Sequence, residues 1–443
     1  GNLIEIEAPG GRKTELKYTD ENLTEIEDPE GNTTKLKYEE GNLTEIEDPE
    51  GNTTKYTYTG GKITEIEDPR GNKIKIEYDQ EGRVKKLIGP KGEETEINYI
   101  DENKTQVIDA KGNITEYTYN KQMCVWTEIK DPKGNIIKQT FDERRNKTTY
   151  TDANENTTNY QYDERGNLIE IQDPEGNITE YTYDQQYNQI LTEKDPLGNI
   201  TTYEYDERGN RIKIIDAEGN ETKYTYDEKG NLTEIEDPEG NVTRYEYDES
   251  GNLIKTEDPE GNTTEYRYDE LGNMIEMEDA RGNITRYQYD ALGRLTEIED
   301  PEGNTTTYQY DENGNRIKTI DAKGNETTYL YDENNRLTQI IDQKGNTTTY
   351  QYDAKGNRIK TIDAKGNETT YIYDEADRLI EIIDSQGGET KYEYDPAGNR
   401  IKEIDKKGNI TQYFYDANNR LIKTIDPEGN PKEYKYDEKG RLI

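Results

Sequence analysis

Carboxylates are the side chains with the most chemical potential in this chain, which holds 98 Asp and Glu residues and has a formal net charge of −41. Two carboxylates that flank a sugar can hydrolyse a glycosidic bond, and clustered oxygens suit calcium. Here the carboxylates recur evenly, as in the run Asp237–Asn241 (Asp-Pro-Glu-Gly-Asn), and no unique pair stands out. That run matches neither the EF-hand loop nor the Gly-Gly-x-Gly-x-Asp repeat. Because turn formation explains these Asp residues, we predict no metal site.

Other catalytic and ligating residues are scarce. The sequence has no His, so its single cysteine, Cys124, has no imidazole to activate it and no second Cys to pair with. Zinc therefore lacks both of its usual ligand types. The glycines are isolated turn positions that form no phosphate-binding loop, and the acidic charge disfavours nucleic acid. We predict no catalytic residue, no cofactor-binding residue and no cofactor, and we expect that the protein is not an enzyme.

The carboxylates belong to a period of about 21 residues that runs through the whole chain, which is typical of repeat architectures. One cycle spans Gly230–Ser250, and the next begins at Gly251. Each cycle holds two Asp-x-x-Gly segments, Asp237–Gly240 and Asp248–Gly251 in this instance. Asp in the first position and Gly in the fourth favour a type I turn closed by a left-handed residue, a common hairpin connection. The pattern predicts two hairpin turns per cycle.

Two segments of strand length separate these turns, Asn231–Glu236 and Asn241–Tyr247. The chain is therefore predicted to be all-β: tandem antiparallel hairpins that form one continuous sheet of about forty short strands, which must twist and curl. Alternation places Tyr245 and Tyr247 on one face and Arg244 on the other. Tyr suits a one-layer wall because its ring is apolar and its hydroxyl can stay hydrated.

An odd period conflicts with the side-chain period of two in a strand. We expect one of the two turns to hold one residue more than the other, which puts Ile235 beside Thr243 and Tyr245 beside Ile254. A β-bulge could solve the same problem.

Composition alone would suggest disorder, since 28% of the residues are hydrophobic. Against this, 38 residues are Tyr and recur at fixed phase, which favours a folded array. No composition shift divides the chain, so we predict a single array over residues 1–443, about 21 repeats of ~21 residues, with no separate catalytic domain. No apolar run approaches the roughly 18 residues of a membrane span, and no signal-like N-terminus is present.

Tyr289–Leu295 (Tyr-Asp-Ala-Leu-Gly-Arg-Leu) and Asp300–Asn304 (Asp-Pro-Glu-Gly-Asn) are good instances of the repeated motifs. In these motifs the chain resembles the YD repeat of the Rhs family, which includes polymorphic toxins, wall-associated proteins, shells of insecticidal toxin complexes and teneurins. The resemblance covers essentially the whole chain. It implies a sheet that spirals into a hollow shell or tube, often around a C-terminal toxic domain. The self-cleaving core segment that ends the shell of many family toxins is not found in the last cycles.

Three local features stay open. Asn120–Trp126 replaces a regular turn and is interpreted as a decayed cycle or as a contact point that holds the only Cys and Trp. Many Asn-x-Thr sequons, such as Asn241–Thr243, follow the turn glycines and are explained by turn chemistry or by glycosylation. The near-identical blocks 304–345 and 346–387 favour a natural duplication, although the regularity also suits a designed array.

We predict a non-catalytic structural array, extracellular or at the cell surface, that forms the wall of a shell, tube or filament. One alternative is a cocoon segment of a polymorphic toxin whose terminal domains lie outside this chain. Another is an adhesion or glycan-binding module that uses exposed Tyr for stacking. Gly1–Ile4 and Gly440–Ile443 occupy the same phase of the cycle. We therefore expect self-association, or continuation of the array, end to end through the sheet edges, with an enclosed toxin domain as a further partner.

Overall fold

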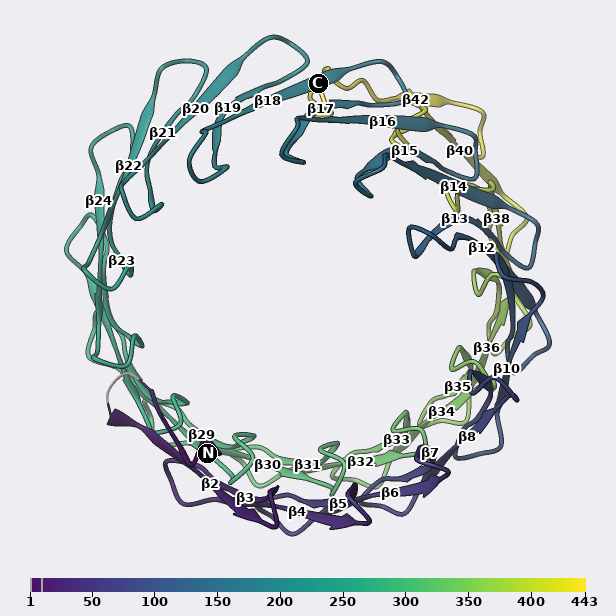
Figure 1. Ribbon diagram of the computed structural model, residues 1–443. Helices are drawn as coiled ribbons and strands as arrows, with labels where there is room; N and C mark the ends of the chain where they lie inside the picture. Colours follow the sequence, from purple (N-terminus) through teal and green to yellow (C-terminus); the bar gives the residue numbers. More distant parts are fainter. Residues whose placement is uncertain (1, 9–10) are drawn as a thin grey trace. The chain divides into compact units, whose positions relative to one another are not determined.

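A single antiparallel sheet contains every strand that the structure describes. The computed structural model describes residues 2–8 and 11–443. Over these residues it has 42 strands in one sheet and no helix, and Figure 1 shows the strands following one another along the chain. Strands that are consecutive in sequence pair with each other, as β23 (Leu232–Glu236) pairs with β24 (Val242–Tyr247) and β24 with β25 (Leu253–Glu257). The prediction of an all-β array of antiparallel hairpins is confirmed.

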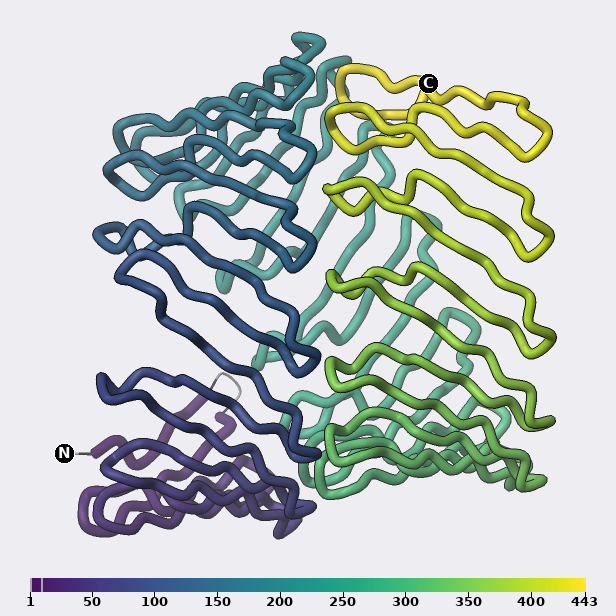
Figure 2. The backbone as a smooth tube through the Cα atoms, turned by 90° about the vertical axis from the view of Figure 1, so that its right-hand side faces the viewer, coloured from purple at the N-terminus to yellow at the C-terminus, as the bar shows by residue number. Residues whose placement is uncertain are grey.

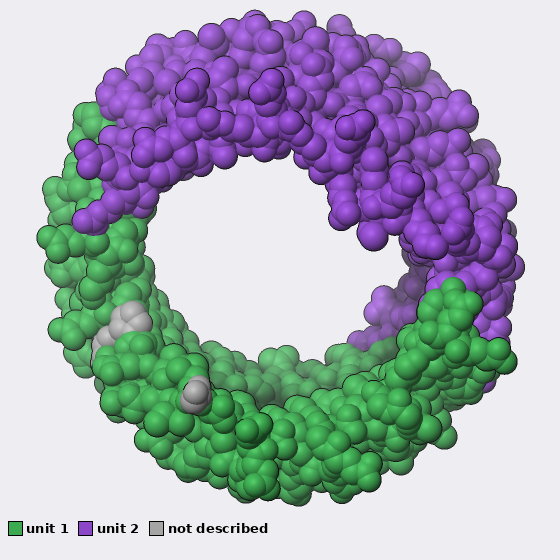
Figure 3. Space-filling model, in the orientation of Figure 1, with its two compact units in different colours: residues 1–93, 222–349 green, residues 94–221, 350–443 purple. Residues whose placement is uncertain are grey.

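The sheet falls into two compact units, each built from two segments that are distant in sequence. Unit 1 contains residues 1–93 and 222–349, and unit 2 contains residues 94–221 and 350–443 (Figure 3). We call the earlier segment of each unit its first tier and the later segment its second tier. In Figure 2 the blue first tier of unit 2 lies beside its yellow-green second tier.

Strands β1 to β21 run through the first tiers of units 1 and 2. They are β1 (Glu5–Glu7), β2 (Lys13–Thr19), β3 (Asn22–Glu27), β4 (Thr33–Glu39), β5 (Asn42–Glu47), β6 (Thr53–Thr59), β7 (Lys62–Glu67), β8 (Lys73–Tyr78), β9 (Val84–Ile88), β10 (Glu94–Tyr99), β11 (Lys104–Ile108), β12 (Ile114–Asn120), β13 (Val125–Lys130), β14 (Ile136–Phe141), β15 (Lys147–Thr151), β16 (Thr157–Tyr162), β17 (Leu168–Gln172), β18 (Ile178–Tyr183), β19 (Ile190–Lys194), β20 (Ile200–Tyr205) and β21 (Arg211–Ile215).

The remaining strands run through the second tiers. They are β22 (Glu221–Tyr226), β23, β24 and β25 as above, β26 (Thr263–Tyr268), β27 (Met274–Glu278), β28 (Ile284–Tyr289), β29 (Leu295–Glu299), β30 (Thr305–Tyr310), β31 (Arg316–Ile320), β32 (Glu326–Tyr331), β33 (Leu337–Ile341), β34 (Thr347–Tyr352), β35 (Arg358–Ile362), β36 (Glu368–Tyr373), β37 (Leu379–Ile383), β38 (Glu389–Tyr394), β39 (Arg400–Ile404), β40 (Ile410–Tyr415), β41 (Leu421–Ile425) and β42 (Pro431–Glu433).

Both turns of a cycle have the same backbone geometry, which corrects the expectation that one is longer. In the turn after β23, Asp237 N donates to Asn241 O at 3.0 Å, and in the turn after β24, Asp248 N donates to Asn252 O at 3.0 Å. The odd residue is absorbed instead by a register shift between Glu246 and Tyr247. This is the bulge that sequence analysis kept as the alternative.

The bulge changes the predicted pairing but keeps the predicted faces. Ile235 lies opposite Thr243 as expected. Tyr245, by contrast, lies opposite Thr256 rather than Ile254, a shift of two residues that leaves the apolar face unchanged.

The bulges also explain why the second aromatic of several Tyr-x-Tyr segments is Tyr rather than Phe. The hydroxyl of Tyr289 donates to the carbonyl oxygen of Met274 at 2.9 Å, and that of Tyr268 donates to Leu253 O at 2.9 Å. Met274 and Leu253 are residues at which the ladder is disrupted by the preceding bulge. A bulge removes a regular hydrogen bond between strands. The Tyr hydroxyl therefore donates to the backbone carbonyl beside the bulge, instead of binding water alone.

The array has a half-buried apolar face in place of a conventional core. Among the described residues no hydrophobic side chain is fully buried. In β24 the residues alternate in exposure, with Tyr245 and Tyr247 half-buried and Arg244 and Glu246 exposed. Each strand therefore depends on its neighbours for burial, as in other repeat proteins.

The irregular segment Asn120–Trp126 closes the hairpin between β12 and β13, with residues 121–124 between the strands. Tyr119 pairs with Trp126 across a bulge, and Cys124 is exposed and takes a positive φ of 54°. The hairpin array therefore continues through this segment. Whether it is a decayed cycle or a contact point stays a hypothesis.

Candidate functional site

The turn Asp residues, which carry most of the chemical potential of the sequence, are first of all structural acceptors. In the turn Asp131–Asn135, Asp131 Oδ1 accepts hydrogen bonds from the backbone N–H of Lys133 (2.9 Å) and of Asn135 (2.8 Å). Its Oδ2 accepts from the Asn135 side chain at 2.7 Å. Asx turns of this kind are why Asp and Asn are favoured there. The side chain of the third turn residue remains available for other contacts.

These third residues join the two tiers of each unit. We call a turn that follows the shorter strand of a cycle, such as Asp131–Asn135, a DP turn, and one that follows Tyr-x-Tyr a YD turn. In both units, DP turns of the first tier meet YD turns of the second tier. We call this line of contacts the seam. The turns that lie on it are seam turns, and the others are outer turns.

In unit 2, cations of the DP turns bind the first Asp of the facing YD turns. Lys111 Nζ lies 2.6 Å from Asp353 Oδ2, and Lys133 Nζ lies 3.0 Å from Asp374 Oδ2. Only 5% of the Asp374 side chain is exposed. The next turn pair uses an amide in place of an amine, since Asn154 Nδ2 donates to a carboxylate oxygen. The seam thus repeats one contact with changing donors.

The reverse contact runs from the YD turns to the first Asp of the DP turns. Lys355 Nζ lies 2.7 Å from Asp109 Oδ2 and 2.5 Å from Asp377 Oδ2, so it bridges the tiers and also reaches the next turn of its own tier. Asn418 donates to Asp173 at 2.6 Å. Each facing pair of turns can therefore exchange two contacts.

Unit 1 has a seam between the same two turn types, with contacts that vary along it, such as the ion pair between Arg294 Nη2 and Glu50 Oε2 at 2.6 Å. One of its turns carries a substitution that sequence analysis missed. Lys91 Nζ lies 3.0 Å from Asp332 Oδ2. The DP turn that holds Lys91 begins with Gly89 instead of Asp, and its fifth residue is Glu93 instead of Asn. Glu93 Oε2 accepts from Lys91 N, and its Oε1 accepts from Asn334 across the seam at 2.6 Å. This turn therefore still has a carboxylate on the seam, but its fifth residue, Glu93, supplies it instead of its first.

Two seam carboxylates, Asp332 and Asp374, are held in the ionised form. On the seam of unit 1, by contrast, burial and the nearby Asp269 carboxylate raise the pKa of Glu30. Burial opposes the ionisation of Asp332, but the Arg336 guanidinium and backbone N–H and the Lys91 ammonium lower its pKa to about 2. Burial likewise opposes ionisation of Asp374, and hydrogen bonds from Arg378 N–H, Lys133 and the Arg378 guanidinium keep its pKa below the usual value. Such groups are poor general acids or bases at neutral pH because they do not exchange protons there.

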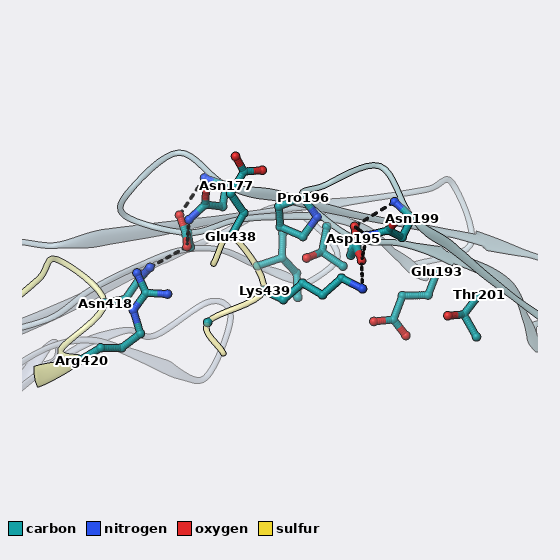
Figure 4. A pocket seen from close by; sticks show the side chains of 14 residues that line it. Asn177, Glu193, Asp195, Pro196, Asn199, Thr201, Asn418, Arg420, Glu438 and Lys439 are labelled. Atoms are coloured by element: carbon teal, nitrogen blue, oxygen red, sulfur yellow. Dashed lines mark hydrogen bonds and ion pairs between the residues drawn. The ribbon is translucent and has the colours of Figure 1, made fainter. Parts of the chain in front are cut away.

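A polar pocket of about 450 Å³ lies on the seam of unit 2 (Figure 4). Figure 4 shows Lys439 reaching toward Asp195, with which it forms an ion pair, while Asn418 reaches the opposite wall. Arg420 Nη2 lies 2.5 Å from Glu175 Oε2 near the same place. The pocket is lined by Ile171, Asp173, Asn177, Thr179, Glu193, Asp195, Pro196, Asn199, Thr201, Asn418, Arg420, Glu438, Lys439 and Gly440.

Two carboxylates of this pocket, Asp173 and Asp195, have lowered pKa values. Asp195 has its pKa lowered, against burial, by Lys439 and by Asn199. Hydrolysis of a glycoside needs one carboxyl group kept protonated as an acid. Within residues 2–8 and 11–443, no group of three or more His, Cys, Asp or Glu is arranged to hold a metal ion. No helix in the described part of the chain is long and apolar enough to span a membrane.

The chain is similar to known repeat shells in sequence and in fold. A family model described as Teneurin YD-shell matches residues 12–128, 131–287 and 273–443. No curated protein matches the chain.

Two solved structures share the fold. One is described as the crystal structure of TcdB2-TccC3, with 15% identity and a TM-score of 0.54, over 99% of this chain and 34% of that one. The other is described as the crystal structure of TcdB2-TccC3-Cdc42, with 14% identity and a TM-score of 0.53, over 99% of this chain and 36% of that one. The chain thus spans about a third of the length of these structures.

Proposed function

Because the chain belongs to the teneurin YD-shell family, with the structural role of an Rhs-type repeat shell, we propose that it is a non-catalytic wall segment. We place this wall outside the cell or at its surface. We also propose that residues 1–443 act as one array without a separate catalytic domain. The observation that carries the proposal is the seam, where carboxylates such as Asp374 are engaged by the facing tier.

The seam supports a wall because it joins hairpins that are far apart in sequence. A single tier of hairpins is held only by its nearest neighbours, and it would open wherever one cycle fails. A second tier that binds the turns of the first adds contacts about 240 residues away, as between Lys133 and Asp374. The array then resists local opening.

A search for hydrolysis tests the non-catalytic role. The purified chain is incubated with chromogenic α- and β-glycosides beside the variants Asp173→Asn and Asp195→Asn, which change carboxylates of the pocket. We expect no turnover above the uncatalysed rate for any of the three proteins. Turnover by the wild type that either variant abolishes would overturn the proposal.

Surface proteolysis of intact source cells tests the proposed location outside the cell. A chain that resists protease until the cells are lysed contradicts that location.

A second candidate is a cocoon segment that encloses a toxin domain supplied by a longer polypeptide. The specific observation in its favour is the shared fold with TcdB2-TccC3 structures, of which the chain covers only a third. Protease treatment of the natural full-length product distinguishes the two roles. A domain that survives while the wall is intact, and is degraded when the wall is unfolded by urea, supports the cocoon.

The adhesion alternative is weaker, because the ring of a Tyr such as Tyr310 is already stacked by Arg294, whose guanidinium carbon lies 4.9 Å from the ring centroid. Self-association of copies is part of the proposal, and the outer turns of unit 2 are the surface that could carry it.

A further inference from the structure

Each tier of unit 2 has one turn edge on the seam and a second edge made of outer turns. The outer edge of the first tier consists of YD turns, and that of the second tier consists of DP turns. These are the same two turn types that bind each other on the seam. The exposed third residues include Lys365 and Lys407 on the outer DP edge and Arg165 and Arg208 on the outer YD edge.

We propose that the outer DP edge of unit 2 binds the outer YD edge of a second copy of this chain, in the geometry of the seam. This names the surface and the chemistry of the self-association in the proposed function, on which it rests. In the copy that docks, the turn Asp163–Asn167 faces Asp363–Asn367, and the turn Asp206–Asn210 faces Asp405–Asn409.

Charge complementarity favours this occupant and disfavours the register one cycle further along. On the seam, a third-position Lys binds the first Asp of the facing turn, as Lys133 binds Asp374. In the proposed pairing, Lys365 and Lys407 face the first Asp of the two docking YD turns. In return, the third residues Arg165 and Arg208 of the copy face the first Asp of the two DP turns. Four oppositely charged pairs form from these two pairs of turns. The turn pair between them brings Gln386 to Asp184 and Gln186 to Asp384, so the interface mixes charged and amide donors as the seam does.

The register one cycle further along is less favourable. It would place Arg165 of the copy opposite Asp384, but it would bring Gln386 in place of a lysine to Asp163. It would also bring Glu428 opposite Asp206, two like charges that repel each other. Specificity then comes partly from the clash in the wrong register.

The outer edges are already shaped for docking. The outer turn Asp363–Asn367 repeats the Asx hydrogen bonds of the seam turn Asp131–Asn135, with Asn367 N and Lys365 N each 2.8 Å from Asp363 Oδ1. Arg165 Nη1 lies 3.2 Å from Asn188 Oδ1 in the next turn of its own tier. Lys355 makes the corresponding contact to Asp377 on the seam and adds a bond across to Asp109. Docking would add a bond across the interface to the contacts that Arg165 makes with Asn188 and with Gln185 O.

Two variants with opposite defects test the proposal. The first, Lys365→Glu with Lys407→Glu, disables the DP edge. The second, Arg165→Glu with Arg208→Glu, disables the YD edge. Glu is the natural third residue of the DP turn at Glu239 and of the YD turn at Glu81, so both turns accept it. Circular dichroism confirms that each variant keeps its β structure.

Sedimentation of the full chain at rising concentration gives the readout. We expect the wild type to form head-to-tail dimers and longer chains, and each variant alone to remain monomeric because each of its interfaces contains a disabled edge. An equimolar mixture should form one-to-one dimers and nothing larger, since only one combination of edges is intact. Added salt should weaken the association, because exposed ion pairs are screened.

A control keeps the net charge matched. Lys402→Glu with Lys423→Glu makes the same change in charge within β39 and β41, away from the turns, and should associate as the wild type does. A wild type that associates while the edge variants associate equally well overturns this interface but not self-association. A wild type that is monomeric at every concentration overturns both, and a mixture without dimers overturns the head-to-tail pairing. None of these results bears on the glycoside assay, which tests the wall separately.

Discussion

The seam turn Asp131–Asn135 and the outer turn Asp363–Asn367 are the same local structure in two environments. Each Asp accepts from the third and fifth backbone N–H and from the Asn side chain, at distances between 2.7 and 2.9 Å. Asn135 is partly buried and Asn367 is exposed. Lys133 binds a carboxylate of the other tier, whereas Lys365 is exposed. Turn geometry is thus a local property, and the ionic contact is a property of the seam.

The largest expected effect comes from removing a seam carboxylate. Asp374→Ala should destabilise the surrounding hairpins by about 3 kcal/mol, because Lys133 and Arg378 lose a nearly buried counter-charge. The matched change in an outer YD turn, Asp163→Ala, removes turn hydrogen bonds that are open to solvent and should cost much less. Native-state hydrogen exchange of each hairpin, at low protein concentration, measures both values. Equal costs would mean that the seam contributes nothing to stability.

The second-largest effect is expected from acid, which should weaken the seam. The folded pKa of Asp332 is about 2, below its ordinary value of 3.8. Since the folded pKa is depressed, the stabilisation is present above about pH 4 and is lost as the pH falls toward 2, about 2 kcal/mol in all. Lys91→Met should make this loss smaller, because one of the cations that lower the pKa is gone. Hydrogen exchange between pH 5 and 2 measures the loss, and an unchanged acid profile in the variant would contradict it.

Glycine substitutions should not distinguish seam from outer turns. Gly112 and Gly366 take φ values of 84° and 83°, and a Cβ at either would meet nothing within 4 Å. Because the cost of the left-handed conformation is local, Ala at either position should destabilise its hairpin by about 1–2 kcal/mol. Asn is expected to be tolerated better, as Asn335 already occupies this position with φ of 58°. A markedly larger cost at Gly112, measured by denaturant-dependent hydrogen exchange, would show that the seam adds a steric constraint.

The smallest effect is expected for the tyrosine hydroxyls. Tyr183 donates to Leu168 O at 2.8 Å in the first tier, and Tyr373 donates to Arg358 O at 3.1 Å in the second. Tyr→Phe at either position should cost about 1 kcal/mol, because the carbonyl beside the bulge loses its partner. Urea denaturation followed by hydrogen exchange of the two hairpins compares them directly. A cost near zero at both would show that water replaces the hydroxyl fully.

Sequence reasoning succeeded for whatever depends on neighbouring residues. The alternation around Tyr245, the Asp-x-x-Gly turns and the hairpin sequence were all predicted and are present. The register was only partly predicted. A cycle with an odd number of residues keeps its apolar side chains on one face if either a longer turn or a bulge accommodates the extra residue, so the sequence does not distinguish the two. The role of Glu93 was missed because it replaces an Asn at the end of a turn that lacks its Asp, and only the facing Asn334 reveals the substitution.

By itself, the sequence determined the strands, the turns and the two chemically different faces, because each is fixed within about one repeat by hydrogen bonds and alternation. The tertiary structure alone decided which turns lie on a seam, because that depends on how much twist accumulates over many hairpins before distant turns meet. Small per-repeat rotations add up over the array and leave no mark on any single cycle. Lys133 and Lys365 therefore look alike in sequence, but Lys133 binds Asp374 of the facing tier, whereas Lys365 lies exposed on an outer edge.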